Sequence, residues 1–287
     1  MADAPASDTG TTQRLREFAF GDEDFTALRT LVKRLTGINL TEQKRELVYG
    51  RLSRRLRALN LSSFRDYRRL LVENSSELVQ LTNAITTNLT AFFREPHHFD
   101  YLREQVLKPR AADPRGSRRV RIWSAGCSTG EEPYSIAMTV LEAIPELARW
   151  DLRILATDLD SDVLQRAQRG LYAADRVSGM DSKRLARFFV EERSGTGSAY
   201  RITPALASLI TFKQLNLMHK LPMRGPLDVI FCRNTVIYFD KQTQRELFGR
   251  FAVLQRAGDM LFLGHSESLF KVSDSYTLIG RTIYRRD

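Results

Sequence analysis

Residues 120–158 constrain the fold of this chain more than any other stretch, because they predict a strand, a glycine loop, a helix and a second strand that ends in an acid. The apolar residues Val120 to Trp123 predict the first strand, which runs into the loop Ala125-Gly126-Cys127-Ser128-Thr129-Gly130. The second strand, predicted over 152–157, ends at Asp158. Glycines after a parallel strand let a ligand approach backbone N–H groups, and an acid ending the next strand can accept two ribose hydroxyls. The pattern therefore predicts a nucleoside pocket.

The residues after the loop indicate which kind of nucleoside the pocket would bind. Glu131 and Glu132 follow Gly130, where they would repel a pyrophosphate at the helix N-terminus, and the Lys-Ser/Thr pair of a phosphate loop is missing. S-adenosylmethionine joins adenosine to a sulfonium and an amino acid and carries no phosphate, so methyl transfer is the leading hypothesis. The structural alternative is that the loop is only a tight turn and that Asp158 only caps a helix.

Composition excludes several classes of protein. The 287 residues suffice for one large domain or two ordinary ones. There is no stretch of about 18 uncharged apolar residues and no apolar signal core at the N-terminus, so we expect a cytoplasmic protein without membrane insertion. The two cysteines, Cys127 and Cys232, form no CxxC pair, and we expect neither a disulfide nor a metal site. We interpret the adjacent His97 and His98 as packing or capping residues.

The positive charge is concentrated in one short region. The net charge is +10, and residues 44–69 hold nine Lys and Arg residues against Glu46 and Asp66. Such a basic region is compatible with nucleic acid, an anionic membrane surface or an acidic protein, and charge alone does not choose among them.

Composition and the pattern of predicted helices and strands divide the chain into four parts. We predict a mobile tail over 1–19, a helical domain over 20–87, a linker and connecting helix over 88–110, and an α/β domain over 111–287. A polar glycine turn and an alternating segment predict a small β-rich insertion within the last part, at about 171–207.

Each half has its own periodicity. Four helices are expected in the helical domain, beginning near Asp22, Thr41, Ser62 and Leu78. The α/β half alternates strands with helices, which indicates a layered domain with a parallel sheet that ends in a hairpin. Its strands are predicted at 120–124, 152–157, 208–213, 227–232, 260–264, 276–279 and 282–285.

Polar residues follow two further strands of the predicted sheet. Asn216 and Leu217 come after one strand, Cys232-Arg233-Asn234 after the next, and Tyr238 lies four residues beyond Asn234. Because an open α/β sheet gathers ligands at the carboxyl ends of its strands, we expect these positions to converge with the glycine loop.

From about Phe20 to its end the sequence resembles the chemotaxis receptor methyltransferase family, the CheR-type protein-glutamate O-methyltransferases. The strings that carry this resemblance are KRELVYGRLSRRLRAL, TTNLTAFFRE, STGEEPYSIA, ATDLD, FCRNTVIYFD and LGHSES. The resemblance implies a Rossmann-like S-adenosylmethionine-dependent methyltransferase sheet with an N-terminal helical domain and a small inserted β-subdomain.

The resemblance also implies roles for individual residues. Glu132 would meet the amino-acid end of the cofactor and Asp158 its ribose, while Arg94 and Tyr238 would lie near the transferable methyl and act in catalysis. The remaining cofactor contacts would be Asn88, Thr90, Arg94, Gly126, Asn216, Leu217, Cys232, Arg233 and Asn234. Taken singly, Asn88 and Thr90 are equally compatible with helix caps, and Tyr238 with a core position.

The implied reaction converts glutamate side chains on the cytoplasmic methylation helices of a chemoreceptor into methyl esters and leaves S-adenosylhomocysteine. Such helices are acidic, so the basic helix with Arg51, Arg54, Arg55 and Arg57 is predicted to guide the receptor toward the pocket. The structural alternative is a solvated arginine-rich helix face.

The sequence leaves two other functions and one further binding site as hypotheses. A nucleic-acid methyltransferase would suit the charge, but the Asn-Pro-Pro-aromatic turn of base-modifying enzymes is replaced here by Asn234-Thr235-Val236-Ile237-Tyr238. A non-catalytic module that keeps the cofactor pocket is the second. Thirdly, some family members bind a receptor's C-terminal peptide at the edge of the β-subdomain; the turn around Gly195 and Gly197 is compatible with this binding but does not decide it.

Overall fold

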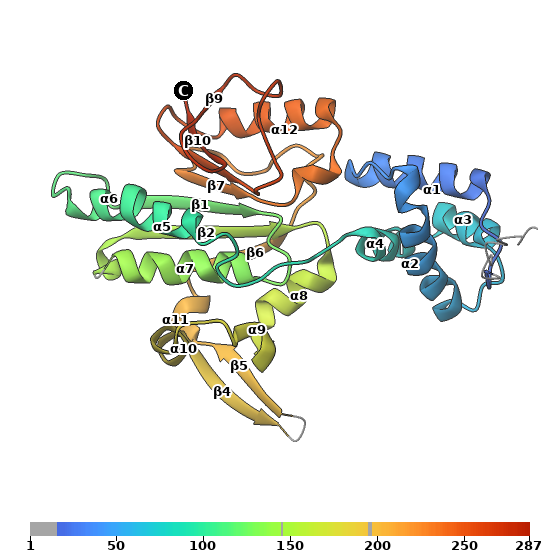
Figure 1. Cartoon of the computed structure of the whole chain (residues 1–287), viewed down its shortest axis with the longest axis horizontal. Coiled ribbons are helices and arrows are strands. Elements are labelled where there is room, and N and C mark those ends of the chain that lie inside the picture. Colours follow the sequence, from blue (N-terminus) through green and yellow to red (C-terminus); the bar gives the residue numbers. More distant parts are fainter. Residues whose placement is uncertain (1–15, 145, 195–196) are drawn as a thin grey trace, which may run out of the picture.

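The computed structural model describes residues 16–287 except Pro145, Gly195 and Thr196. A helical domain (residues 16–85) stands at one end of the molecule, a mixed seven-stranded sheet with helices on its faces forms the centre, and a small antiparallel sheet projects from it (Figure 1). The predicted fold class is confirmed. None of the described helices has both the length and the apolar character needed to cross a bilayer.

The helical domain packs its helices around one apolar core. Ser63 accepts a hydrogen bond from the backbone N–H of Asp66 as the cap of the third helix, as the sequence predicted. The first helix is capped differently, because Gly21 is the N-cap and Asp22 is already helical. The elements are α1 (Asp22–Thr36), the 3₁₀ turn η1 (Glu42–Lys44), α2 (Arg45–Ala58), α3 (Phe64–Glu73) and α4 (Ser75–Ile85).

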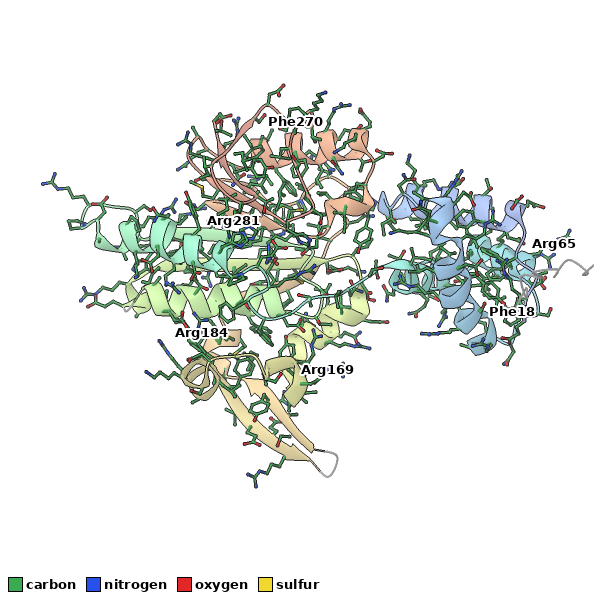
Figure 2. All side chains as sticks on the ribbon, in the orientation of Figure 1. Phe18, Arg65, Arg169, Arg184, Phe270 and Arg281 are labelled. Carbon is green, nitrogen blue, oxygen red and sulfur yellow. The ribbon has the colours of Figure 1, made fainter. Side chains whose placement is uncertain are left out.

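This core begins earlier in the chain than the sequence predicted. Phe18 is buried, and its ring lies 6.4 Å from that of Phe64 in an edge-on arrangement (Figure 2). Residues 16–19 therefore belong to the helical domain instead of the tail expected over 1–19, whose first 15 residues lie outside the described chain.

The central sheet has the order β6-β2-β1-β7-β8-β10-β9. The first five of these strands are parallel to one another. β10 is antiparallel to both β8 and β9, which gives the predicted terminal hairpin. The bounds are β1 (Arg119–Ala125), β2 (Asp151–Asp158), β6 (Ile210–Gln214), β7 (Val229–Cys232), β8 (Met260–Leu263), β9 (Tyr276–Leu278) and β10 (Ile283–Arg286).

Helices cover both faces of the sheet because successive strand side chains point to opposite sides. On β1, Ile122 packs into the cluster that contains α7 (Glu131–Ala143), whereas Trp123 packs into the cluster with α12 (Lys241–Val253). The other elements around the sheet are α5 (His97–Tyr101), the π-helical turn η2 (Leu102–Leu107), α6 (Lys108–Ala112), η3 (Leu147–Arg149), α8 (Ser161–Arg169), α11 (Pro204–Ala207) and η4 (Val236–Tyr238).

The inserted β-subdomain is an antiparallel sheet of order β3-β5-β4, with two short helices between β3 and β4. Arg184 fastens it to the α/β domain, since its guanidinium pairs with Glu142 of α7 at 2.7 Å and lies 4.2 Å from the ring centre of Phe93 (Figure 2). The bounds are β3 (Leu171–Ala173), α9 (Ala174–Val177), α10 (Ser182–Phe188), β4 (Phe189–Ser194) and β5 (Gly197–Ile202). Gly195, in the predicted turn, lies outside the described residues.

The helical domain contacts the sheet where the chain leaves β6 and β7. The side-chain amide of Asn216 donates to the carbonyl of Leu35 at 2.6 Å, and the backbone N–H of Asn39 donates to the carbonyl of Tyr238 at 2.8 Å. Lys33 adds an ion pair with Asp240 at 2.7 Å. Beside these contacts, a cleft lies between the two domains at the carboxyl ends of the strands.

Candidate active site

The cleft between the domains has a volume of about 1120 Å³, its open mouth included, and contains the convergence that the sequence predicted. Its walls come from the end of α1, the linker after α4, the glycine loop and the turns after β2, β6 and β7. The predicted site residues that line it are Asn88, Thr90, Arg94, Gly126, Glu132, Asp158, Asn216, Leu217, Arg233, Asn234 and Tyr238.

Cys232 does not line the cleft. It is the last residue of β7, and its fully buried side chain belongs to the apolar cluster beneath α12. The alternation of side chains along a strand turns the Cys232 side chain away from the cleft, so its predicted cofactor contact stays a prediction for its backbone.

The glycine loop takes a conformation that other residues would not tolerate. Gly126 has φ of 99°, and a Cβ built there would lie 2.3 Å from the hydroxyl oxygen of Thr235. Its backbone N–H donates to the carbonyl of Thr157 at 2.8 Å. The loop is thereby folded against the ends of β2 and β7, and its backbone faces the cleft.

Asp158 is a buried acid at the end of β2. One carboxylate oxygen accepts the N–H of Ser128 at 2.8 Å and the other that of Asp160 at 3.0 Å. Burial raises the pKa of Asp158 to about 6, although the backbone donors act in the opposite direction. A carboxylate oxygen has more than one acceptor position, so Asp158 can hold the loop and still accept ribose hydroxyls.

The linker is tied to the same strand ends through Asp160. One oxygen of Asp160 caps α8, and the other accepts from the amide of Asn88 and the hydroxyl of Thr86, each at 2.7 Å. The Ser128 hydroxyl donates to the carbonyl of Asn88 at 3.0 Å. The side-chain amide of Asn88 therefore fixes the linker at the edge of the cleft.

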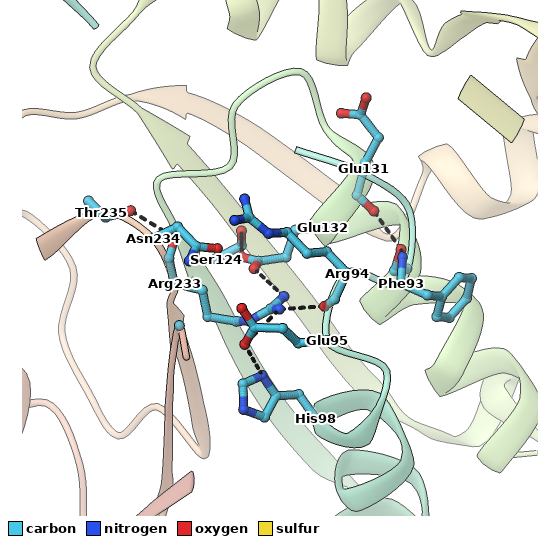
Figure 3. A network of polar contacts seen from close by, with 12 residues as sticks. Phe93, Arg94, Glu95, His98, Ser124, Glu131, Glu132, Arg233, Asn234 and Thr235 are labelled. Atoms are coloured by element: carbon cyan, nitrogen blue, oxygen red, sulfur yellow. Dashed lines mark hydrogen bonds and ion pairs between the residues drawn. The ribbon is translucent and has the colours of Figure 1, made fainter. Parts of the chain in front are cut away.

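A buried network of ion pairs forms the floor of the cleft (Figure 3). Arg233, whose side chain is 2% exposed, pairs with Glu132 at 3.0 Å and with Glu95 at 3.3 Å, and it donates to the carbonyl of Arg94. Glu132 also accepts from the hydroxyl of Ser124 at 2.7 Å. Burial raises the pKa of Glu132, and the charge of Arg233 opposes that rise. Removal of either partner would leave an uncompensated buried charge.

His98 packs behind this network, as the sequence predicted. It is fully buried, and its Nε2 donates to the carbonyl of Arg281 at 3.0 Å because a carbonyl can only accept. Burial, and then the charge of Arg233, lowers the pKa of His98 to about 4, so the ring is neutral at pH 7. Ligand atoms of Glu95, His97 and His98 lie within 4.8 Å of one another, but the guanidinium of Arg233 already neutralises Glu95.

Arg94 and Tyr238, the predicted catalytic pair, both line the cleft. One guanidinium nitrogen of Arg94 donates to the carbonyl of Leu89 at 2.8 Å, which leaves other N–H groups for an incoming carboxylate. The Nζ of Lys44 lies 4.8 Å from the ring centre of Tyr238. The pair thus stands where the helical domain meets the α/β domain.

The four arginines predicted to guide the receptor have different surroundings. Arg51 donates to the carbonyl of Thr86 at 2.8 Å and the hydroxyl of Thr87 at 2.9 Å, so it anchors the linker. Arg55 pairs with the buried Glu77 at 2.6 Å. Arg57 pairs with Glu17 at 2.7 Å on the surface. Arg54 is exposed, and among the described residues it makes no ion pair.

A second anchor joins the inserted subdomain to the cleft. Arg176 of α9 donates to the carbonyl of Thr90 at 2.9 Å and pairs with Glu131, which also accepts from the hydroxyl of Thr129 at 2.6 Å. The side chain of Glu131 is therefore occupied by structure, and Thr90 is positioned through its backbone.

Sequence reasoning missed the contribution of the helical domain to the cleft wall. Thr36, Ile38, Leu40 and Lys44 line it, and of these only Lys44 falls in a string that carried the resemblance. It also missed the anchoring acids Asp160 and Glu267, although both lie inside strings that carried the resemblance, ATDLD and LGHSES.

The lining chemistry fits S-adenosylmethionine. Asp158 and Glu132 offer carboxylates for the ribose and the ammonium group, and apolar residues, among them Leu215 and Leu217, suit the faces of an adenine ring. The cleft is open to solvent at its mouth, where a second molecule can enter.

Comparison with known proteins gives matches along nearly the whole chain. Residues 23–86 match the family described as CheR methyltransferase, all-alpha domain, and residues 88–285 match CheR methyltransferase, SAM binding domain. Chemotaxis protein methyltransferase 2 of Pseudomonas aeruginosa is 43% identical over 94% of this chain and 95% of its own length. The chemotaxis protein methyltransferase of Escherichia coli is 40% identical over 95% of this chain and 93% of its own length. That of Borreliella burgdorferi is 35% identical over 86% of this chain and 88% of its own length.

Proposed function

The chain belongs to the CheR methyltransferase family, and from this premise we propose that it methylates glutamate side chains on the cytoplasmic helices of chemoreceptors. It is an S-adenosylmethionine-dependent chemotaxis protein methyltransferase. The observation that carries the detailed proposal is the single cleft that gathers the linker, the glycine loop and the turns after three strands. Because the substrate helices are cytoplasmic, the proposal also assigns the protein to the cytoplasm.

The cofactor is assigned to the cleft through its polar residues. Asp158 receives the ribose hydroxyls, Glu132 and the linker around Asn88 and Thr90 receive the amino-acid end, and Leu217 covers the adenine. The backbone of Gly126 allows close approach. When bound, S-adenosylmethionine supplies a methyl group activated by a positively charged sulfur.

The chain's own residues then orient the reacting carboxylate. A glutamate with a pKa of about 4.3 is ionised at neutral pH, so no general base is needed to expose the nucleophile. Arg94 holds and partly neutralises the carboxylate by charge-assisted hydrogen bonds, and the Tyr238 hydroxyl aligns it with the methyl carbon. Positioning at near-attack distance accounts for most of the acceleration.

Arg54 is the residue of the basic helix assigned to the receptor. It is exposed, whereas the guanidinium groups of Arg51, Arg55 and Arg57 have partners within the helical domain or its linker. A cation on this surface attracts the acidic methylation helices at long range and is sensitive to salt.

The proposal is tested by methyl incorporation. The protein is incubated with radiolabelled S-adenosylmethionine and receptor cytoplasmic fragments, and the labelled fragment is treated with alkali. Glutamyl esters release the label as methanol, whereas N-methyl products keep it. Alkali-stable label, or label found only in nucleic acid, would contradict the proposal, and cofactor binding without transfer would favour a non-catalytic module.

Binding of the receptor's C-terminal peptide at the β-subdomain is tested separately. Calorimetric titration with a C-terminal pentapeptide should give binding if the edge of the three-stranded sheet adds a strand. A flat titration would exclude this second contact for the peptide used.

A further inference from the structure

One acid outside the cleft organises the loop that lines it. Glu267 follows β8, the residue is 4% exposed, and its carboxylate accepts five backbone N–H groups. One oxygen accepts from Gly264 at 2.6 Å and Asn234 at 2.8 Å. The other accepts from Thr235 at 2.9 Å, Val236 at 2.8 Å and Ile237 at 3.2 Å.

These five bonds define the turn between β7 and η4. Four consecutive donors, from Asn234 to Ile237, point at one carboxylate, so the chain wraps around it and turns sharply. Asn234 adopts a positive φ of 55° there. Buried N–H groups that lose their acceptor are destabilising, so the turn depends on this single side chain.

The segment that follows β8 leaves no room for a different conformation of this turn. A Cβ built on Gly264 would lie 2.3 Å from the side-chain nitrogen of Asn234 and 2.8 Å from its backbone nitrogen. The backbone of Gly264 thus packs directly against Asn234. Glu267 accepts hydrogen bonds from the backbone N–H groups that this contact buries.

The turn carries groups of the proposed active site. Asn234, Thr235 and Tyr238 line the cleft, and the hydroxyl of Thr235 lies against Gly126 of the glycine loop. A shift of the turn by a fraction of an ångström would move Tyr238 away from its alignment with the substrate.

We propose that Glu267 is a positioning residue of the methyl transfer, which acts through the turn of residues 234–237 on the placement of Tyr238. This inference rests on the proposed function. The carboxylate is required chemically as well as sterically, because each of its oxygens is an acceptor. A glutamine of the same shape would turn one N–H₂ group toward backbone N–H donors.

The test uses the full chain with E267Q, and Asp259→Asn serves as the matched control. Asp259 is also a buried acid that accepts a backbone N–H, from Arg256 at 2.7 Å, but it holds no part of the cleft. Assays run well below the melting temperature of every variant. We expect E267Q to lower kcat by about tenfold or more with a smaller change in the KM for the cofactor, and D259N to leave both within about twofold.

A double-mutant cycle with Tyr238→Phe separates positioning from general damage. If Glu267 acts through Tyr238, its substitution has much less effect in the Tyr238→Phe background than in the wild type, because the aligned hydroxyl is already absent. Fully multiplicative effects on kcat, or equal kinetics of E267Q and wild type, would overturn the inference.

Amide hydrogen exchange supplies a readout that needs no activity. Peptides that cover residues 233–240 should exchange at least tenfold faster in E267Q than in the wild type, while peptides from β1 are unchanged. Unchanged exchange in 233–240 would overturn the inference even if the wild type methylates receptors. Faster exchange in a protein whose wild type fails to methylate would instead count against the proposed function alone.

Discussion

Asp158 combines two properties that pull in opposite directions, since it is buried yet must be ionised to accept the ribose hydroxyls. Burial raises its pKa to about 6 in the free protein. The ionised acid costs desolvation, which the N–H groups of Ser128 and Asp160 offset in part. A cofactor hydroxyl adds further donors to the ionised form, so binding and deprotonation are linked.

The affinity for S-adenosylhomocysteine should therefore fall as the pH drops through about 6. Below that pH the site must release a proton to bind, and the limiting slope is about tenfold per pH unit for one proton. Calorimetry between pH 5 and 8 measures this. The Asp158→Asn variant should bind weakly with a flat profile, and a wild-type profile as flat as that of the variant would contradict the role of Asp158.

Arg94 is predicted to matter for chemistry and not for folding. Arg94→Ala should lower kcat by about 10²–10³-fold, the range for loss of a donor to developing or neutralised charge. Its melting temperature should stay close to that of the wild type because the side chain's hydrogen bond to Leu89 is exposed. Arg65→Ala, an exposed arginine at the far end of the helical domain, is the matched control (Figure 2); equal activity of the two variants would remove the role.

At the scale of elements, α2 separates two kinds of arginine. Arg51 lies next to the end of α4 and donates to its last carbonyls, including that of Ile85, and to the linker that follows. Arg54 stands one turn away and faces solvent. Spacing on a helix predicts which residues share a face but does not tell whether that face meets solvent or the end of another helix.

Substitution of Arg51 and substitution of Arg54 should therefore have different effects. Arg51→Ala should weaken cofactor binding and lower the melting temperature, because it releases the linker that holds Asn88 and Thr90. Arg54→Glu should leave cofactor binding unchanged, raise the KM for receptor fragments severalfold and flatten its dependence on salt. Calorimetry and initial rates at several salt concentrations separate the two, and an identical profile for both variants would contradict the assignment.

The sequence predicted most elements and most of the cleft, and its omissions share a cause. Strand periodicity and the glycine loop are local signals, so β1, β2 and the terminal hairpin were predicted to within a few residues. Asp160 binds the linker, and Glu267 binds the turn after β7, across 30 or more residues of sequence. Nothing local in either acid specifies these distant partners. Whether a given strand-end side chain points into the cleft, as for Cys232, depends on the phase of β7 on the sheet.

At the scale of the whole molecule, the cleft belongs to neither domain alone. Residues from 36–44 and from the turns after β6 and β7 share its wall, and the linker crosses between them. A ligand in this position contacts both domains, so its binding free energy stabilises their association.

Cofactor binding should accordingly protect both domains from amide exchange. At about 100 times the dissociation constant, the ligand adds about 2.7 kcal/mol to the stability of the state that binds it. We expect slower exchange in residues 36–44 and 86–94 as well as in the glycine loop, measured with S-adenosylhomocysteine. Protection limited to the α/β domain would contradict a cleft shared by both.

The most direct measurement is a crystal structure of the full chain with S-adenosylhomocysteine. The account predicts the ribose hydroxyls on the carboxylate of Asp158, the amino-acid end beside Glu132 and the sulfur facing the side where Arg94 and Tyr238 stand. A ligand bound elsewhere, or a cleft closed by its own side chains in the presence of saturating ligand, would contradict it.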